Sequence, residues 1–191
     1  MRPPHQVRII GGQWKRSKLP VPDAPGLRPT PDRVRETLFN WLGQDLDGWR
    51  CLDAFAGSGA LGFEAASRGA AEVVLVERDA ALVRSLRESQ RRLSAQAVRI
   101  ETADALAFMR RAAPGSVELV FLDPPFDADV FERALEAAAP LLVPGGFVYL
   151  ESDRAFDGAA ASGLGLSLHR HGRAGAVHYH LFLRTAGSDA A

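Results

Sequence analysis

The sequence predicts an α/β protein whose β-sheet is mostly parallel. From residue 50 onward, short apolar runs alternate with segments of helical periodicity, and a glycine-rich turn follows the first run. Strands that are connected through helices pair in parallel by right-handed crossovers, and helices cover both faces of such a sheet. The last two apolar segments have no helix between them, which predicts an antiparallel hairpin at one edge of the sheet.

The N-terminal segment is expected to form a short β-hairpin ahead of this alternation. Residues 7–10 and 17–21 are extended apolar runs with a glycine pair after the first, and the proline-rich stretch 20–29 connects them to the rest of the chain. The sequence therefore predicts an N-terminal arm, residues 1–29, and one α/β domain, residues 30–191.

The elements of the α/β domain follow from the spacing of apolar residues. The first helix is expected to have the Thr30 hydroxyl as its N-cap and Pro31 in its first position. The final hairpin is expected to pair residues 165–169 with 177–183. Between them, strands are predicted at 51–54, 73–76, 98–100, 117–122 and 147–150, and further helices at 61–67, 80–93, 106–111 and 130–141.

The composition excludes several classes of protein. At 191 residues with 47% hydrophobic residues, the chain has the size and apolar content of one globular domain with a core. It has no apolar run long enough to cross a membrane, and its first residues lack the apolar stretch of a signal peptide. Its single cysteine, Cys51, cannot form an intrachain disulfide. These features predict a cytoplasmic protein without membrane association.

The formal net charge of zero hides an uneven distribution along the chain. Residues 1–35 carry eight basic and two acidic residues, which gives +6, whereas residues 36–153 carry 11 basic and 19 acidic residues, which gives −8. A basic arm on an acidic body is typical of a segment that contacts a polyanion. Exposed loops can also collect arginine and lysine without such a partner, and the charge alone does not decide between the two interpretations.

Four acidic residues stand at or just after the ends of predicted parallel strands. They are Asp53, Glu77, Asp104 and Asp123. Ligands of such sheets bind outside the carboxyl ends of the strands. Because carboxylates gathered at one edge cost free energy unless they have partners, this edge is the predicted site.

The glycine turn after Asp53 fits two kinds of cofactor. Residues 57–62 match G-x-G-x-x-G between a strand and a helix, and Glu77 follows 20 residues later, as in dinucleotide-binding proteins. However, the Asp53 carboxylate would repel a pyrophosphate and attract the ammonium and sulfonium groups of S-adenosylmethionine. The chain is also short for two nucleotide-binding halves and a substrate domain. The sequence therefore favours S-adenosylmethionine over NAD.

Each acid near this turn has an expected role toward the cofactor. We expect Asp53 to bind the ammonium group, Glu77 the ribose hydroxyls and Asp104 the adenine amino group. Glu77 could instead belong to a solvated loop, and Asp104 could cap the helix that follows it. The predicted cofactor-binding residues are Asp53, Phe55, Gly57, Ser58, Gly59, Glu77, Arg78, Asp104 and Ala105.

The most distinctive segment is Asp123-Pro124-Pro125-Phe126. Two successive prolines fix two φ angles at about −65° and remove two N–H donors, so the turn is stiff and offers acceptors only. An aromatic ring beside such a turn can stack on a flat base. The segment is suited to an amine-bearing ring, and it predicts Asp123, Pro124 and Phe126 as catalytic residues.

These motifs resemble a known family. The segment 123–126 is similar to the catalytic motif of methyltransferases that act on exocyclic amino groups of nucleobases. Together with residues 8–12, 27–36 and 53–62, it resembles the bacterial small-subunit ribosomal RNA (guanine-N2) methyltransferases of the RsmD type. The resemblance runs from Arg8 to about Arg184 and so covers nearly the whole chain.

The resemblance implies a substrate, a mechanism and a partner. A guanine of small-subunit ribosomal RNA, free or in an assembling subunit, would take the methyl group on its exocyclic N2. Asp123 and the carbonyl of Pro124 would each accept one N–H of the amine, and Phe126 would stack on the base. No metal is required, and a monomer is expected. The residues expected to contact RNA are Arg8, Trp14, Lys15, Arg16, Lys18, Arg28, Thr30 and Arg33. Arg28, Thr30 and Arg33 could instead fold over the cofactor, and Trp14 could instead cover the edge of the core.

Other functions stay open on the sequence alone. A methyltransferase of DNA or of another RNA would share the proline turn, and a non-catalytic ribosome-assembly factor would use the fold only to bind RNA. A dehydrogenase is a more distant alternative. The C-terminal pairs His169/His171 and His178/His180 could hold a metal, but solvated strand faces or RNA contacts explain them better because no cysteine or carboxylate stands beside them.

Overall fold

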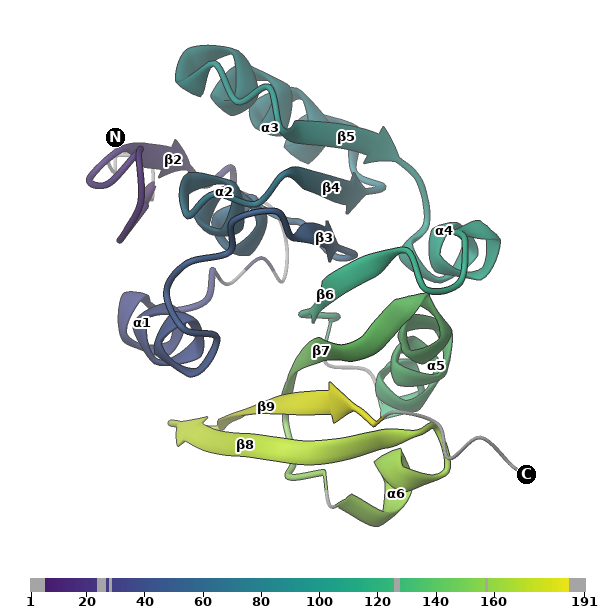
Figure 1. Ribbon diagram of the computed structural model, residues 1–191. Coiled ribbons are helices and arrows are strands. Elements are labelled where there is room, and N and C mark those ends of the chain that lie inside the picture. The colour runs from purple at the N-terminus through teal and green to yellow at the C-terminus, as the bar shows by residue number, and fades with distance from the viewer. Residues whose placement is uncertain (1–5, 24–26, 28, 126–127, 157, 186–191) are drawn as a thin grey trace. The chain divides into compact units, whose positions relative to one another are not determined.

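The computed structural model describes residues 6–23, 27, 29–125, 128–156 and 158–185, and the chain forms two compact units, residues 1–105 and 106–191. The predicted site residues Arg28 and Phe126 lie outside the described residues. Both units contain the expected alternation of strands and helices (Figure 1). Among the described residues, no helix is long and apolar enough to cross a membrane.

The N-terminal arm is part of the first unit and contains a two-stranded antiparallel hairpin, as predicted. Its strands are β1 (Gln6–Arg8) and β2 (Lys18–Pro20). Val7 pairs with Leu19 and both are buried, whereas Lys18 is exposed. Because successive side chains of a strand point to opposite faces, the hairpin places its apolar residues inward and its basic residues in solvent.

The body of the first unit is a parallel sheet of three strands with helices beside it (Figure 1). Because the strands are parallel, their carboxyl ends meet at one edge, where Asp53 and Glu77 are the last residues of their strands and Asp104 follows the third strand. Three of the four predicted strand-end acids therefore share one edge of one unit. The strands, in spatial order, are β5 (Val98–Thr102), β4 (Glu72–Glu77) and β3 (Arg50–Asp53).

The helices of the first unit differ in how much of their surface is covered. Every residue of α2 (Ala60–Ser67) is buried, because the arm covers the helix in addition to the sheet. Helix α3 (Ala80–Leu93) buries one stripe only, and the Asp79 side chain caps it by accepting the N–H groups of Ala81 and Leu82. The capping satisfies two of the donors that the first turn of a helix leaves open.

The predicted N-cap of α1 (Asp32–Trp41) is wrong. The N-cap residue is Pro31, no side chain caps the helix, and Thr30 is buried. The Pro31 carbonyl accepts the N–H groups of Val34 and Arg35, while the Thr30 carbonyl accepts Nε of the Arg35 side chain. Because the first turn closes onto the Pro31 carbonyl, the helix starts one residue later than the Thr-Pro pattern predicts.

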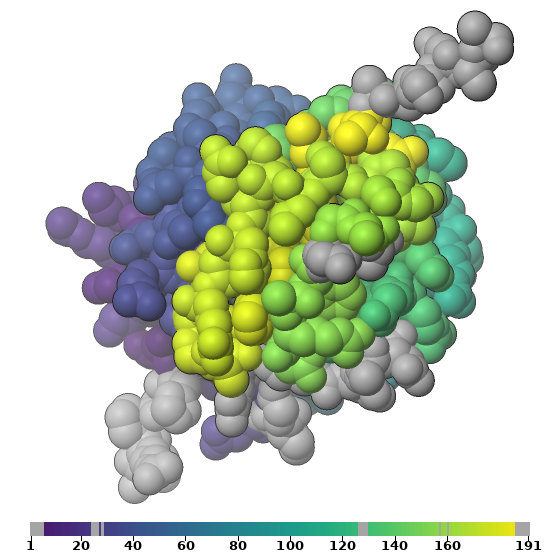
Figure 2. All heavy atoms as spheres, turned by 90° about the horizontal axis from the view of Figure 1, so that it is seen from below, coloured from purple at the N-terminus to yellow at the C-terminus, as the bar shows by residue number. Residues whose placement is uncertain are grey.

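The second unit is a mixed sheet of four strands. In spatial order they are β6 (Val117–Leu122), β7 (Leu142–Ser152), β9 (Val177–Arg184) and β8 (Leu166–Ala174). The first pair is parallel, and β9 is antiparallel to both of its neighbours, which confirms the predicted C-terminal hairpin. Figure 2 shows the outer surface of this hairpin in yellow-green and yellow. The helices are α4 (Ala105–Arg111), α5 (Ala128–Ala138), the 3-10 turn η1 (Ala139–Leu141) and α6 (Gly158–Ser162).

Two elements of the second unit depart from the prediction. Strand β7 begins at Leu142 and ends at Ser152, well beyond the predicted range 147–150, because it continues through a glycine pair with an irregular register against β6. The five-residue helix α6 was not predicted, since its small residues carry no apolar periodicity.

Candidate active site

The glycine turn joins β3 to α2 with backbone angles that favour glycine. Gly57 and Gly59 have φ angles of 53° and 79°, and Gly59 is the N-cap of α2. A Cβ atom on Gly62 would lie 2.1 Å from a methyl carbon of Leu75 and 3.1 Å from Oδ2 of Asp53. The glycines therefore let α2 start directly against β4 and against the acid that ends β3.

Asp53 is buried and is bonded to the first turn of α2. The residue is 1% exposed, and its Oδ2 accepts a 2.9 Å hydrogen bond from the backbone N–H of Gly62. The N-terminal turn of a helix offers N–H donors and a positive partial charge, both of which stabilise a carboxylate. Asp53 thus shapes the turn, and its direct contact with a cofactor stays a prediction.

Glu77 is half-buried and ties the glycine turn to the end of β4. Its Oε2 accepts the N–H of Gly57 at 3.0 Å, and its Oε1 accepts the N–H groups of Arg78 and Asp79 at 2.8 and 2.9 Å. A carboxylate that accepts three backbone N–H groups is fixed in position, whereas the alternative interpretation of the sequence placed Glu77 in a solvated loop. The backbone of Arg78, one of the predicted cofactor-binding residues, therefore takes part in holding Glu77.

Together the two acids occupy N–H groups that an anionic ligand would use. Dinucleotide sites bind the pyrophosphate with backbone donors at the glycine turn and the helix N-terminus. Here the N–H groups of Gly57 and Gly62 are bonded to Glu77 and Asp53 instead. The turn carries two carboxylates, so it suits a cationic ligand and disfavours a pyrophosphate.

The other predicted cofactor residues lie around this edge with different exposures. Phe55 is half-buried, and Ser58 is buried within the turn. Asp104 is exposed directly before α4, whose first residue, Ala105, is buried. The roles assigned to these side chains stay predictions.

The second unit carries the proline turn at the carboxyl end of β6. The strand ends at Leu122, and the next residue, Asp123, is half-buried. Pro124 is buried and Pro125 is exposed. Because neither proline has an N–H group, the backbone after Asp123 presents carbonyl oxygens without competing donors.

A second acid of this unit, which the sequence analysis did not single out, stands beside the turn. Glu151 is buried near the end of β7, and its Oε1 accepts a 2.9 Å hydrogen bond from the Tyr149 hydroxyl. Burial raises the pKa of Tyr149 well above its usual value, and the charges of Glu151 and Asp123 raise it further. An acid directly after an apolar strand is the signal that could have found it, because Glu151 follows the predicted strand 147–150 as Glu77 follows 73–76.

Known proteins match both the sequence and the fold. The family model described as Conserved hypothetical protein 95 matches residues 7–183. The chain is 44% identical over 187 residues to ribosomal RNA small subunit methyltransferase D of Escherichia coli strain K12. The aligned region covers 96% of this chain and 93% of that protein. The chain belongs to this methyltransferase family. The member of the same name from Haemophilus influenzae is 40% identical over 154 residues, with 78% and 80% of the two chains covered.

Solved structures extend the match to three dimensions. "Putative methyltransferase yhhF from Escherichia coli" superposes with a TM-score of 0.82 at 43% identity, covering 95% of this chain and 99% of that one. A hypothetical protein of Thermus thermophilus gives a TM-score of 0.74 at 34% identity, with 92% and 98% covered. These superpositions confirm the predicted Rossmann-like methyltransferase fold of this chain.

The basic residues predicted to contact RNA are mostly exposed on the arm. Lys15, Arg16 and Lys18 are exposed, whereas Trp14 is half-buried and its backbone N–H is bonded to the Ser67 hydroxyl. The arm is thus fixed to the body by its backbone while its charged side chains face solvent.

The remaining predicted RNA contacts are less uniform. Arg33 is exposed on α1, and Arg8 is exposed but forms an ion pair with Asp32 at 2.9 Å. Thr30 is buried and offers its carbonyl to Arg35, so its side chain is not positioned for a surface contact.

Sequence reasoning missed a buried charged cluster that fastens the arm to the body. Glu64, on α2, is fully buried and accepts the N–H groups of Ile10 and Gly11 at 2.9 and 2.8 Å. The same carboxylate forms ion pairs with Arg35 at 3.1 Å and Arg68 at 2.9 Å. Burial lowers the pKa of Arg35, and Glu64 opposes that effect. Arg68 is four residues from Glu64, but Ile10, Gly11 and Arg35 are 29 to 54 positions away, so a local pattern could reveal only the Arg68 pair.

The C-terminal histidines form a stack on the β8–β9 hairpin. The rings of His171 and His180 are stacked with centroids 4.7 Å apart, and those of His171 and His178 are 5.2 Å apart. His180 is buried, and its Nε2 accepts the backbone N–H of Phe156 at 3.0 Å. Burial lowers the pKa of His180 to about 4, so the ring is neutral and serves as a structural acceptor.

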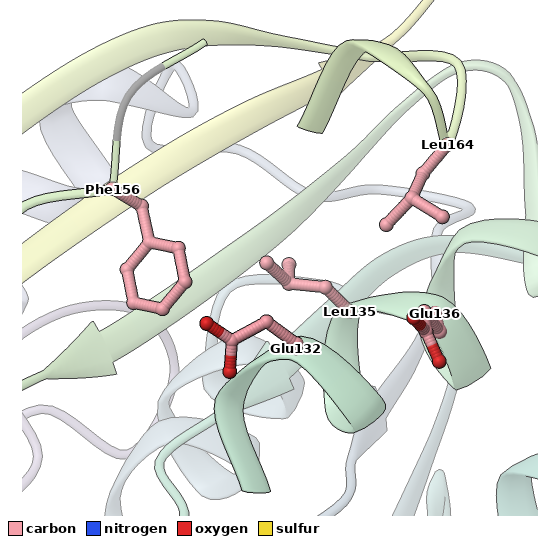
Figure 3. Close-up of a pocket in the computed structure, with 5 residues that line it drawn as sticks. All are labelled: Glu132, Leu135, Glu136, Phe156 and Leu164. Atoms are coloured by element: carbon pink, nitrogen blue, oxygen red, sulfur yellow. The ribbon is translucent and has the colours of Figure 1, made fainter. Parts of the chain in front are cut away.

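The second unit contains a small pocket beside α5. Figure 3 shows Glu132, Leu135 and Glu136 of α5 at one side of it and Phe156 and Leu164 at the other. Arg154 forms an ion pair with Glu132 at 2.6 Å and lies over the Phe156 ring. None of the predicted catalytic or binding residues lines this pocket, so it has no part in the candidate active site.

Proposed function

We propose that this protein transfers a methyl group from S-adenosylmethionine to the exocyclic N2 of a guanine in small-subunit ribosomal RNA. The observation that carries the proposal is Asp123, a half-buried strand-end acid followed by two prolines that cannot donate hydrogen bonds. The names of the Escherichia coli and Haemophilus influenzae family members support the reaction and the class of RNA.

The first unit fits the cofactor in its charge. S-adenosylmethionine carries its transferable methyl group on a positively charged sulfonium. The carboxylates of Asp53 and Glu77 hold the glycine turn in place and give this edge a negative charge, which favours a cation. We infer that Asp53 holds the ammonium group, Glu77 the ribose and Asp104 the adenine.

The proline turn fits the amine of a nucleobase. The exocyclic nitrogen of guanine is a weak nucleophile because its lone pair is delocalised into the ring. If the Asp123 carboxylate and the Pro124 carbonyl each accept one N–H, the nitrogen becomes more pyramidal and its lone pair is available for the new bond. The nitrogen would form the new C–N bond as the bond between the methyl carbon and sulfur breaks, and the sulfur would leave as a neutral thioether. The Asp123 carboxylate would accept the proton that the nitrogen then loses.

The substrate RNA has to present the base to this turn. A stacked or paired base must first be extruded, at a cost of a few kcal/mol. Phe126 is expected to stack on the extruded base, and the exposed Lys15, Arg16 and Lys18 of the arm are expected to bind phosphates. Phosphate contacts of this kind predict that RNA affinity falls steeply with salt.

The function is tested by mapping modified nucleosides of ribosomal RNA in cells with and without this gene, using mass spectrometry. We expect one N2-methylguanosine of the small subunit to disappear in the deletion strain and to return when the wild-type gene is restored. An Asp123→Asn gene should not restore it. An unchanged small-subunit RNA, or the loss of a different modification, would contradict the proposal.

A further inference from the structure

The buried acid Glu151 lies beside the predicted catalytic acid. Leu122 of β6 pairs with Leu150 of β7, so Asp123 and Glu151 are the next residues on two neighbouring parallel strands. In a regular register, residues that follow a paired position lie on the same face of the sheet. The Tyr149 hydroxyl is bonded to Glu151, and Phe121, the strand partner of Tyr149, stands two residues before Asp123, so the three groups lie on the same stretch of the two strands.

This position is costly for a carboxylate that serves stability alone. Glu151 is 4% exposed, and removing a carboxylate from water is unfavourable unless hydrogen bonds replace the water. The Tyr149 hydroxyl supplies one such bond at 2.9 Å and fixes the orientation of the carboxylate. A carboxylate can accept several hydrogen bonds at its two oxygens, so this bond is compatible with a further donor from a ligand.

The ligand that matches two neighbouring acids carries two neighbouring donors. The Watson–Crick edge of guanine offers the N2 amine and, next to it, the N1–H. Adenine and 2,6-diaminopurine have an acceptor at N1 instead. Neighbouring strands are about 4.8 Å apart, a separation over which two carboxylates can reach two adjacent atoms of one base edge.

We propose that Glu151 forms a base-reading subsite that accepts the N1–H of the target guanine while Asp123 accepts the N2 amine. The subsite rests on the proposed function, because it assigns the part of the guanine that Asp123 does not bind. It rejects bases with an N1 acceptor, since two acceptors then face each other and the buried carboxylate loses its partner. Tyr149 is a positioning residue that holds the Glu151 carboxylate toward the base.

The test compares two substrates in one variant. Ribosomal RNA is prepared with either guanine or 2,6-diaminopurine at the mapped target position. Both bases carry the N2 amine; they differ at N1 and at the C6 substituent, and the C6 difference is the same for wild type and variant. Wild-type protein should prefer guanine in kcat/KM. Glu151→Gln should lower this preference about tenfold or more, because the amide can donate to the N1 of diaminopurine, as expected for a hydrogen bond of about 1.5–3 kcal/mol to a charged group.

Controls separate base reading from folding. Glu132→Gln, an exposed acid of the same unit, should leave the preference unchanged. Tyr149→Phe retains the Glu151 carboxylate, so it should lower kcat/KM but keep the preference for guanine. If Glu151→Gln does not fold, Glu151→Asp keeps the charge on a shorter side chain and should raise KM for guanine RNA while diaminopurine RNA stays a poor substrate.

The outcomes discriminate between the subsite and the proposed function. Equal losses for both substrates in Glu151→Gln would mean a structural acid and would overturn the subsite, as would wild-type kinetics in Glu151→Asp. A wild-type protein that methylates no guanine of ribosomal RNA would overturn the proposed function before the variants are compared.

Discussion

The two units of this protein use buried and half-buried carboxylates in different ways. In the first unit, Asp53, Glu64 and Glu77 all accept backbone N–H groups, from Gly62, from Ile10 and Gly11, and from the glycine turn respectively. In the second unit, Glu151 accepts a tyrosine hydroxyl, and Asp123 precedes two prolines that have no N–H to offer.

Carboxylates therefore fix backbone structure in the first unit and are suited to ligand chemistry in the second. A carboxylate bonded to backbone N–H groups fixes the path of the chain, because it satisfies donors that loops and helix ends leave open. The turn after Asp123 lacks backbone N–H groups at Pro124 and Pro125, so its backbone presents acceptors to a ligand that carries donors. The contrast predicts that substitutions in the first unit act mainly on stability and cofactor binding, and that those in the second unit act mainly on methyl transfer.

The largest effect is expected from Glu64→Gln. The carboxylate is fully buried between Arg35 and Arg68, and removing its charge leaves both guanidinium groups without full compensation. Breaking a buried ion pair costs about 3–5 kcal/mol of stability. Urea unfolding measures the loss, with Glu36→Gln, an exposed acid of α1, as the matched control. Equal stability of the two variants would contradict a structural role for Glu64.

The next largest effects are expected from Asp123→Asn and Asp53→Asn, which should impair different steps. Asp123→Asn should lower methyl transfer about 10²–10³-fold while calorimetric binding of S-adenosylmethionine is retained, since the amide oxygen still accepts a hydrogen bond but cannot accept the proton. Asp53→Asn should weaken cofactor binding and remove about 1–3 kcal/mol of stability, because it disturbs the bond to Gly62. The same pattern in both variants would break the contrast between the two units.

Alanine substitutions at Gly12 and at Gly175 test how closely the arm packs against the body of the first unit. Gly12 has a φ of 73°, and a Cβ there would lie 1.8 Å from the Ser67 carbonyl oxygen, whereas Gly175, with a φ of 61°, has no atom within 4 Å of such a Cβ. Both alanine variants incur the same backbone strain, so the difference reports the clash. Gly12→Ala should be less stable than Gly175→Ala by about 1–3 kcal/mol, and limited proteolysis should cleave its arm faster. Indistinguishable variants would mean that the arm is not docked this way.

The smallest effect is expected in the pH dependence of stability. In the second unit, the His180 imidazole accepts a hydrogen bond from the backbone N–H of Phe156. Burial lowers the pKa of His180 to about 4 from 6.5, so the unfolded chain binds this proton at a higher pH than the folded chain. The stability that neutral His180 contributes is therefore present above pH 6.5 and is lost as the pH falls from 6.5 toward about 4. Urea unfolding across this range should give a shallower slope for His180→Asn than for wild type, and parallel curves would contradict the assignment.

The sequence predicted the fold because the signals of an α/β alternation are local. Apolar runs, glycine turns and helical spacing located nearly all the strands and helices, and the acids after them identified one edge of the first sheet. The Glu64 cluster escaped prediction because Ile10 and Glu64 are 54 positions apart and meet only through tertiary packing.

Two further differences between prediction and structure, at Thr30 and at Glu151, had local causes. The Thr30 cap failed because the Arg35 side chain takes the Thr30 carbonyl and the helix closes onto Pro31 instead. Glu151 directly follows the predicted strand 147–150, as Glu77 follows the predicted strand 73–76, but no glycine or proline motif drew attention to it. The observed strand ends two residues later, at Ser152, and contains this acid. In both cases a long side chain or a strand extension overrode the local pattern.

The central claim is that the Asp123 turn directs methylation to the amine of guanine. The most direct measurement incubates unmodified small-subunit ribosomal RNA with methyl-labelled S-adenosylmethionine and identifies the labelled nucleoside after digestion. We expect label in N2-methylguanosine with wild-type protein and a loss of about 10²–10³-fold with Asp123→Asn. Label in any other nucleoside, or full labelling with Asp123→Asn, would contradict it.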